Sequence, residues 1–164
     1  MVPPLHYHID QAEAFRIVQG EGHIFRNSTD KPWVTLSAND PHGLKTAVIP
    51  KLDYHTIHNA STTEPMIMDV HLSPEDYVSE ERFFRNFFGY LDDCKRAGQE
   101  PSLFQLMVFL KASDTPLGLG NSAGWLGHLW SCVFYETTSW WGYWVLGYQP
   151  SYQEYYTDNT SKGK

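Results

Sequence analysis

Two histidines and a glutamate near the N-terminus have the residue types and the spacing of metal ligands. The stretch PPLHYHIDQAEAFRIVQGEG, residues 3–22, contains His6, His8 and Glu13. Side chains alternate along a strand, so His6 and His8 on a strand would project to the same face. Two imidazoles and a carboxylate suit a divalent metal such as iron, manganese, nickel, copper or zinc. The pattern predicts a metal site, and the alternative is a polar N-terminal tail.

A second stretch, PKLDYHTIHN at residues 50–59, decides between these readings. Together the two stretches resemble the paired motifs of the cupin superfamily. The first motif is HxH, three or four residues, Glu, six residues and Gly, and the chain matches it from His6 to Gly20. The second motif is PxGxxHxxxN, which Pro50, His55 and Asn59 match, with Leu52 in place of the usual glycine.

The resemblance implies a fold and a ligand set. The fold is a small cupin-type β-barrel, also called a double-stranded β-helix, and the metal ligands are His6, His8, Glu13 and His55. Fe(II) is the favoured metal, and Mn, Ni, Cu and Zn are alternatives. Only five residues precede His6, so we expect a barrel truncated at its N-terminus, one completed by a partner subunit or the C-terminal helices, or a degraded relative.

Short runs of β character in residues 1–72 are expected to position these ligands. Turn residues separate the runs, and such closely spaced strands indicate a sandwich or a small barrel. Alternation places Glu13, Phe15 and Ile17 on one face of their strand. Alternation also predicts four side chains that line a substrate pocket: Phe15, Ile17, Met66 and Met68. The predicted strands cover residues 13–19, 23–26, 32–37, 45–50 and 64–72.

The pattern changes to helical from Ser73, so we expect a barrel at 1–72 and a helical extension at 73–164 that packs on the barrel or on a partner. A helix is predicted from Ser73 to Gly98, with Ser79 as an alternative start. Its phenylalanines at 83, 84, 87 and 88 form an apolar stripe. A second helix is predicted over 101–110.

Residues 123–148 contain five of the six tryptophans of the chain. His128, Glu136 and the run Thr137-Thr-Ser interrupt the apolar character, which argues against a membrane-spanning helix. We expect this segment to pack against the barrel or a second subunit of a homodimer. The alternative is weak contact with a membrane interface.

Composition limits the function classes of this 164-residue chain. Its formal net charge of −7 and the lack of a basic stripe make nucleic acid an unsuitable partner. Two cysteines outside any CxxC pattern, and the lack of a secretory signal, predict a cytoplasmic protein.

The helical extension also resembles that of fungal cupin proteins, including ones from secondary-metabolite pathways. That resemblance implies a metal-dependent tailoring enzyme that acts on a small aromatic or polyketide-like molecule. Fe(II) oxygenase-type chemistry is our first hypothesis. The enzymatic alternative is metal-assisted isomerisation, cyclisation or lyase chemistry. The non-enzymatic alternative is a ligand-binding or dimerisation module without catalytic activity. The residues that carry out the reaction are not identifiable from the sequence.

Overall fold

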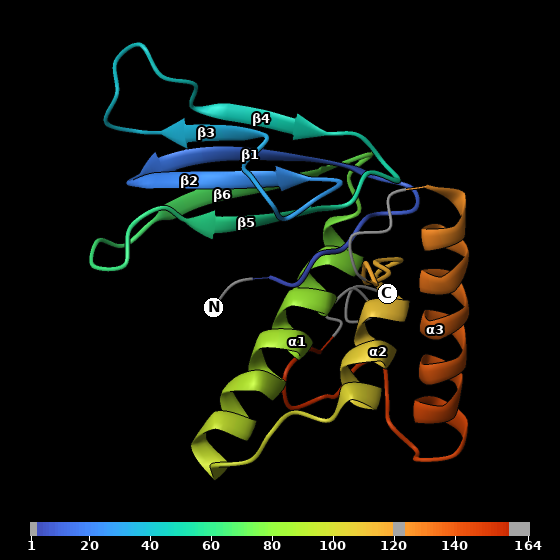
Figure 1. Ribbon diagram of the computed structural model, residues 1–164. Helices are drawn as coiled ribbons and strands as arrows, with labels where there is room; N and C mark the ends of the chain where they lie inside the picture. The colour runs from blue at the N-terminus through green and yellow to red at the C-terminus, as the bar shows by residue number, and fades with distance from the viewer. Residues whose placement is uncertain (1–2, 120–123, 158–164) are drawn as a thin grey trace, which may run out of the picture. The chain divides into compact units, whose positions relative to one another are not determined.

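Six strands in the first half of the chain form two small antiparallel sheets (Figure 1). The computed structural model describes residues 3–119 and 124–157. One sheet has the strand order β4-β1-β6 and the other has the order β3-β2-β5. The strands are β1 (Ala12–Gln19), β2 (Glu21–Arg26), β3 (Val34–Ser37), β4 (Thr46–Ile49), β5 (His55–Asn59) and β6 (Ile67–Ser73).

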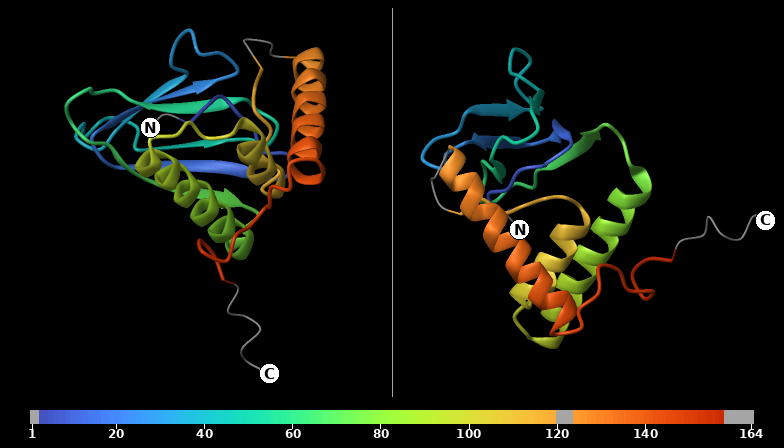
Figure 2. Two further views of the ribbon diagram at one scale, coloured as in Figure 1. Left: turned by 90° about the horizontal axis from the view of Figure 1, so that it is seen from below. Right: turned by 90° about the vertical axis from the view of Figure 1, so that its right-hand side faces the viewer.

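One apolar core joins the two sheets, which lie one over the other (Figure 1 and Figure 2). The alternation predicted for the first strand is confirmed, because Glu13, Phe15 and Ile17 are the buried side chains of β1. The core is made of residues from five strands of both sheets: Phe15, Ile17, Ile24, Leu36, Ile49 and Ile57.

The β character of the first half is therefore confirmed, but the described strands do not close into a barrel. Each sheet has three strands, and among the described residues no hydrogen-bonded strand pair joins one sheet to the other. The arrangement is the sandwich that the spacing also allowed. The segment that carries His6 and His8 is also not a regular strand, because it makes only isolated bridges, in which His6 pairs with His55 and with Leu117.

Three helices follow the strands, so the helical character of the second half is also confirmed. They are α1 (Tyr77–Ala97), α2 (Leu103–Ala112) and α3 (Trp125–Trp144). The predicted helix start at Ser73 is wrong, because that residue still belongs to β6. The N-cap of α1 is Asp76, whose side chain accepts a hydrogen bond from the backbone N–H of Ser79 at 3.2 Å.

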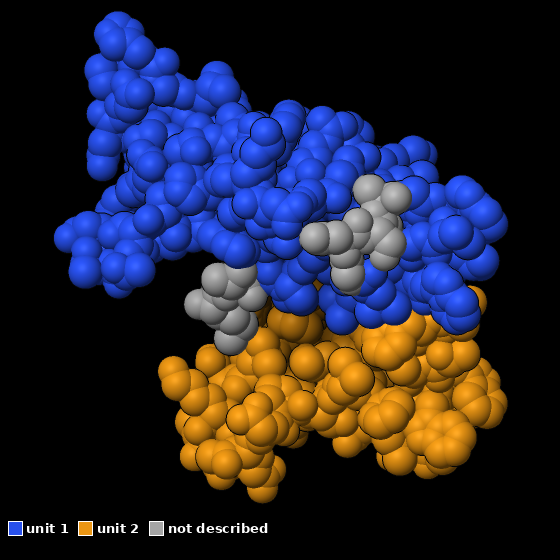
Figure 3. Space-filling view, viewed as in Figure 1, with its two compact units in different colours: residues 1–75, 115–132 blue, residues 76–114, 133–164 orange. Residues whose placement is uncertain are grey.

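The chain forms two compact units (Figure 3). Unit 1 comprises residues 1–75 and 115–132, and unit 2 comprises residues 76–114 and 133–164. The boundary predicted from the sequence followed residue 72. Helix α3 contributes its first eight residues to unit 1 and the others to unit 2. None of the described helices is long and apolar enough to span a bilayer.

Gly20 takes the chain from one sheet to the other. Its φ of +78° lies in the left-handed region, and a Cβ atom there would lie 2.8 Å from the carbonyl oxygen of Pro65. A side chain at this position is therefore disfavoured both by backbone conformation and by a backbone contact.

We expect Gly20→Ala to lower the free energy of unfolding by about 2 kcal/mol or more, because it adds a steric clash to the cost of about 1–2 kcal/mol for a left-handed residue. Gly98→Ala is the matched control, since Gly98 has φ of +64° and a Cβ atom added there would meet no atom within 4 Å. Urea unfolding measures both variants. Equal losses would contradict the close contact between Gly20 and Pro65.

Candidate metal centre

The four predicted ligands come together in unit 1. His6, His8, Glu13 and His55 each offer one ligand atom, and these atoms all lie within 4.8 Å of one another. Two metal bonds of about 2.1 Å span about 4.2 Å, so movements of less than about 1 Å would bring all four into coordination distance. Among the residues that the structure describes, no other group of His, Cys, Asp and Glu has this arrangement. The group could bind a metal ion.

The imidazoles converge on a single carboxylate oxygen. Glu13 Oε2 lies 2.5 Å from His55 Nε2, 3.1 Å from His8 Nε2 and 3.9 Å from His6 Nε2. Such short contacts between imidazole nitrogens and a carboxylate need protons between them. A bound divalent cation would displace those protons, which is how metal binding and proton release are coupled.

Each imidazole is oriented through its other ring nitrogen. His6 Nδ1 lies 2.8 Å from the carbonyl oxygen of Pro4, and His55 Nδ1 lies 2.9 Å from that of Asp53. His8 Nδ1 lies 3.2 Å from the hydroxyl of Thr115. Outer partners of this kind fix the ring orientation of metal ligands in proteins. All three Nε2 atoms are therefore directed to the same point.

Burial and charge keep His6 and Glu13 in the protonation states that a metal needs. Burial and the neighbouring His55 lower the pKa of His6 to about 4, against the opposing charge of Glu13. Burial would raise the pKa of Glu13, but hydrogen bonds with His55 and His8 outweigh it and hold that pKa well below its usual range. At neutral pH His6 is thus a neutral imidazole and Glu13 a carboxylate, as coordination requires.

The segment that carries His6 and His8 is held between two other parts of unit 1. The backbones of His6 and His55 exchange hydrogen bonds of 3.1 and 2.8 Å. On the other side, the N–H of Tyr7 donates to the carbonyl of Pro116 at 3.1 Å, and the N–H of Gly118 donates to that of Leu5 at 2.7 Å. Two bridging segments thus anchor a ligand pair that has no strand of its own.

Tyr7 anchors the same segment on the face opposite the two histidines. It is almost fully buried, at 1% exposure, and its hydroxyl lies 3.2 Å from the sulfur of Cys132. Its ring contacts those of Tyr54 and His128 edge to face. The alternation assumed for the HxH motif therefore holds locally, with the imidazoles on one side and a buried tyrosine on the other.

The turn before His55 is braced by an ion pair. The guanidinium of Arg26 donates to the carboxylate of Asp53, with Nε 2.7 Å from Oδ2. Asn27 and Tyr54 exchange hydrogen bonds across the same turn. These contacts hold the Asp53 carbonyl in the position where it meets His55.

Sequence reasoning missed these supporting residues, because Thr115 and Arg26 lie outside the ligand motifs and Tyr54 occupies a variable position of the second motif. Thr115 is 107 residues from His8, and no short-range spacing could have indicated the contact.

The four predicted pocket residues lie on the core side of the sheets. Phe15 is the one beside a ligand, with its ring 5.9 Å from that of His55. Phe15 and Ile17 are each 3% exposed, and Met66 and Met68 are partly buried against the same core. Their role in substrate binding stays a prediction.

The other histidines have separate environments. His58, three residues after His55, is half-buried and packs its ring 4.6 Å from that of Phe25. His23 lies 2.9 Å from the hydroxyl of Thr35, and His71 lies 3.3 Å from Glu75. None of the three joins the ligand group.

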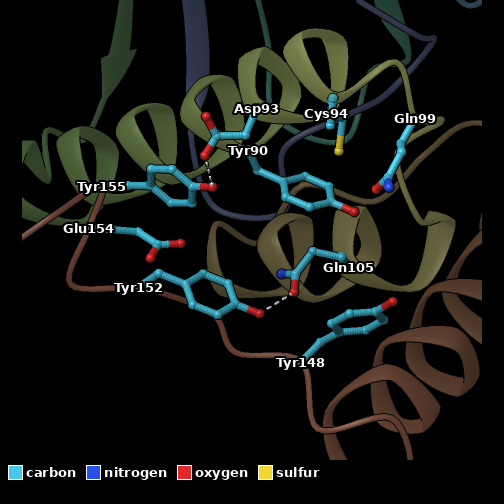
Figure 4. A pocket seen from close by; sticks show the side chains of 10 residues that line it. Tyr90, Asp93, Cys94, Gln99, Gln105, Tyr148, Tyr152, Glu154 and Tyr155 are labelled. Carbon is cyan, nitrogen blue, oxygen red and sulfur yellow. Dashed lines mark hydrogen bonds between the residues drawn. The ribbon is translucent and has the colours of Figure 1, made fainter.

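Unit 2 contains a hollow of about 330 Å³ with a different character (Figure 4). Its polar side chains bind one another: the hydroxyl of Tyr155 donates to Asp93 and that of Tyr152 donates to Gln105, both at 2.6 Å. The hollow thus follows from the packing of the C-terminal segment of unit 2, and among the described residues it holds no cluster of metal ligands. Its lining is rich in tyrosine: Tyr90, Tyr148, Tyr152 and Tyr155.

Leu52 occupies the motif position where glycine is usual, and the structure shows why glycine suits it. Its φ is +68°, and its N–H donates to the carbonyl of His8 at 2.9 Å. The side chain is 47% exposed, so it contributes little burial.

We expect Leu52→Gly to raise the free energy of unfolding by about 0.5–1 kcal/mol, because it replaces a leucine in the left-handed conformation by a residue that adopts it without strain. Urea unfolding measures the change. Leu44→Gly is the control, and a gain in both variants would contradict this reason.

Thr115 tests the outer contacts of the ligands. We expect Thr115→Val to weaken metal affinity about 10–100-fold, because His8 loses the partner that orients its ring. Thr115→Ser, which keeps the hydroxyl, should bind metal like the unmodified protein. Titration calorimetry with Zn(II) or Fe(II) measures the affinities, and equal affinities for the Val and Ser variants would contradict the orienting role.

Comparison with known proteins gives relatives in fungi. The chain is 34% identical to the probable oxidoreductase virH of Hypocrea virens over 98% of the chain and 70% of that protein. It is 33% identical to the oxidoreductase iacF of Pestalotiopsis fici over 70% of the chain and 55% of that protein. It is 26% identical to the probable oxidoreductase yanE of Aspergillus niger over 95% of the chain and 60% of that protein.

The chain thus spans between 55% and 70% of the length of these proteins. No family model matches it, and no solved structure matches it. Because the match to the Hypocrea virens protein covers nearly the whole chain, this protein belongs to the family of fungal proteins that carry the name oxidoreductase.

Proposed function

We propose that this protein is a cupin-type, metal-dependent oxidoreductase that acts on a small aromatic or polyketide-like metabolite. The observation that carries the proposal is the convergence of three imidazole Nε2 atoms on the carboxylate of Glu13. The names of its fungal relatives support the general oxidoreductase role.

The donor set favours Fe(II) among the candidate metals. Neutral imidazoles and one carboxylate suit a borderline divalent ion, and open positions beside such ligands are typical of non-haem Fe(II) oxygenases. Bound by His6, His8, Glu13 and His55, the metal would supply redox chemistry toward O₂ and Lewis acidity toward a substrate oxygen.

The surrounding side chains of unit 1 would serve that chemistry in other ways. Phe15 and the apolar core beside it exclude water on one side of the ligands. The partners of the three Nδ1 atoms keep the ligand set in place before any substrate arrives, and such preorganisation is what a reactive site requires. An apolar wall next to a few polar groups also suits a small aromatic ligand.

Metal binding is the first test. We expect the full chain, purified without metal, to bind one Fe(II) under anaerobic conditions and to lose more than about 100-fold in affinity in His55→Ala, which removes a direct ligand. His58→Ala is the matched control on the same strand and should bind like the unmodified protein. If the metal-free chain takes up no stoichiometric metal, or if both variants bind equally, the proposal is wrong.

Oxygen uptake then distinguishes the reaction types. We expect the Fe(II)-loaded protein to consume O₂ with a phenolic or quinol substrate, whereas the His55→Ala variant should not. A product formed without O₂ consumption would instead favour metal-assisted isomerisation or lyase chemistry. Stoichiometric metal with no turnover of any tested substrate would favour the non-catalytic, ligand-binding alternative.

A further inference from the structure

The solvent-exposed side of the second half of α3 is apolar, whereas the exposed side of a helix in a globular protein is normally polar. An amphipathic helix buries its apolar stripe and exposes polar residues. Here the buried residues are Tyr135, Ser139 and Gly142, of which two are small. The exposed side, which we call the aromatic face, consists of Val133, Trp140, Trp141, Tyr143 and Trp144, and continues into Val145 and Leu146.

Close packing within unit 2 explains the small residues on the buried side. A Cβ atom at Gly142 would lie 2.8 Å from the carbonyl oxygen of Phe104 in α2. The hydroxyl of Tyr135 donates to the carbonyl of Leu110 at 3.3 Å. The helix therefore packs on α2 through its small and hydroxylated side, which leaves the large aromatic side chains outward.

The exposure of these side chains is large. Trp140 is 56% exposed, Trp141 48% and Trp144 70%. Aromatic side chains of this kind bury about 150–250 Å² each when they are covered, so an uncovered group of them is unfavourable in water. The first half of the same helix, counted in unit 1, has the same composition: Trp125, Leu126, Leu129 and Trp130 are all about half exposed or more.

The aromatic face carries no net charge. The acidic residue beside it, Glu136, is one turn before Trp140 and forms an ion pair with Lys111 of α2, with Nζ 2.5 Å from Oε1. The hydroxyl of Thr137, on the same side, donates to the carbonyl of Val133 at 2.7 Å. Hydroxyls bonded to their own helix backbone can enter an apolar environment without losing a hydrogen bond.

The indole N–H groups indicate what kind of partner could cover this face. Within the described part of the chain, none of the hydrogen bonds uses the indole of Trp140, Trp141 or Trp144. Indole only donates, and a covered indole N–H needs an acceptor. A second copy of the same face would bring more donors, while its carboxylate and its Thr137 hydroxyl are already engaged. The headgroup region of a bilayer supplies phosphate, ester carbonyl and water acceptors in excess.

We propose that the aromatic face of α3 binds the interface of a zwitterionic lipid bilayer, with the helix lying in the plane of the membrane. Trp and Tyr are the residues enriched at this depth, and no described helix can cross the bilayer. The lipid is zwitterionic because the face is neutral and the chain has a formal net charge of −7, which anionic headgroups repel. Such attachment would place an oxidoreductase where apolar metabolites partition.

Vesicle binding tests this proposal with the full chain. We expect the protein to sediment with phosphatidylcholine vesicles and its tryptophan emission to shift to shorter wavelength. The triple variant Trp140→Gln, Trp141→Gln, Trp144→Gln should bind at least about tenfold more weakly, because it removes apolar area from the interface. Replacing part of the phosphatidylcholine by phosphatidylglycerol should not strengthen binding.

Trp33→Gln is the matched control, since Trp33 is a tryptophan of unit 1 that is 47% exposed and lies under the guanidinium of Arg26. It should bind vesicles like the unmodified protein. Circular dichroism and urea unfolding should show that the triple variant is folded, as expected for changes at exposed positions. Analytical ultracentrifugation is run on the same samples without lipid.

Two results would overturn the proposal. One is an unmodified protein that stays in the supernatant with phosphatidylcholine vesicles. The other is a triple variant that binds vesicles normally; if that variant also changes from dimer to monomer, the aromatic face belongs to a contact with a second copy. Neither result depends on metal or oxygen, so failure here leaves the proposed oxidoreductase function to its own tests.

Discussion

A buried carboxylate on the inner face of β1 is the constraint on which unit 1 depends. An ionised group removed from water is costly unless it is paired and hydrogen-bonded. Glu13 is 7% exposed, and imidazoles from two other segments surround its Oε2 atom. The segment of His6 and His8 and the start of β5 must therefore both reach β1. A metal ion bound to the same atoms would satisfy the same requirement and would couple binding to stability.

Contacts distant in sequence complete this arrangement. Residues 115–118 accept or donate backbone hydrogen bonds along the N-terminal segment, and Thr115 orients His8. Tyr7, buried against Tyr54 and His128, fixes the opposite side of that segment. The segment of His6 and His8 is not a regular strand, but its backbone is hydrogen-bonded on both sides, as that of a strand within a sheet is.

Helix α3 illustrates a different balance. Its second half packs through Gly142 and Ser139, since only small residues allow the close approach to α2 that the contact with Phe104 requires. The consequence is that Trp140 and Trp144 project into solvent. Chains rarely leave so much aromatic area uncovered without a partner. The packing of α3 on α2 and the proposed contact with lipid therefore involve opposite sides of one helix.

The sequence by itself determined the four candidate ligands and the type of most elements. The spacing of His6, His8, Glu13 and His55 is a local property of two short motifs, and the structure brings these four side chains together. Strand alternation and helix periodicity are also local, so the inward face of β1 and the helical character of the second half were predictable. The left-handed position at Leu52 was visible as a missing glycine.

Only the tertiary structure decided how these elements combine. The choice between a sandwich and a closed barrel depends on which strand edges meet, and the contact that orients His8 joins residues 107 positions apart. The side of α3 that faces solvent also depends on its packing against α2, which periodicity cannot reveal when both sides contain apolar residues. Such long-range pairings are set by the sum of many weak contacts, and no single stretch of sequence contains that sum.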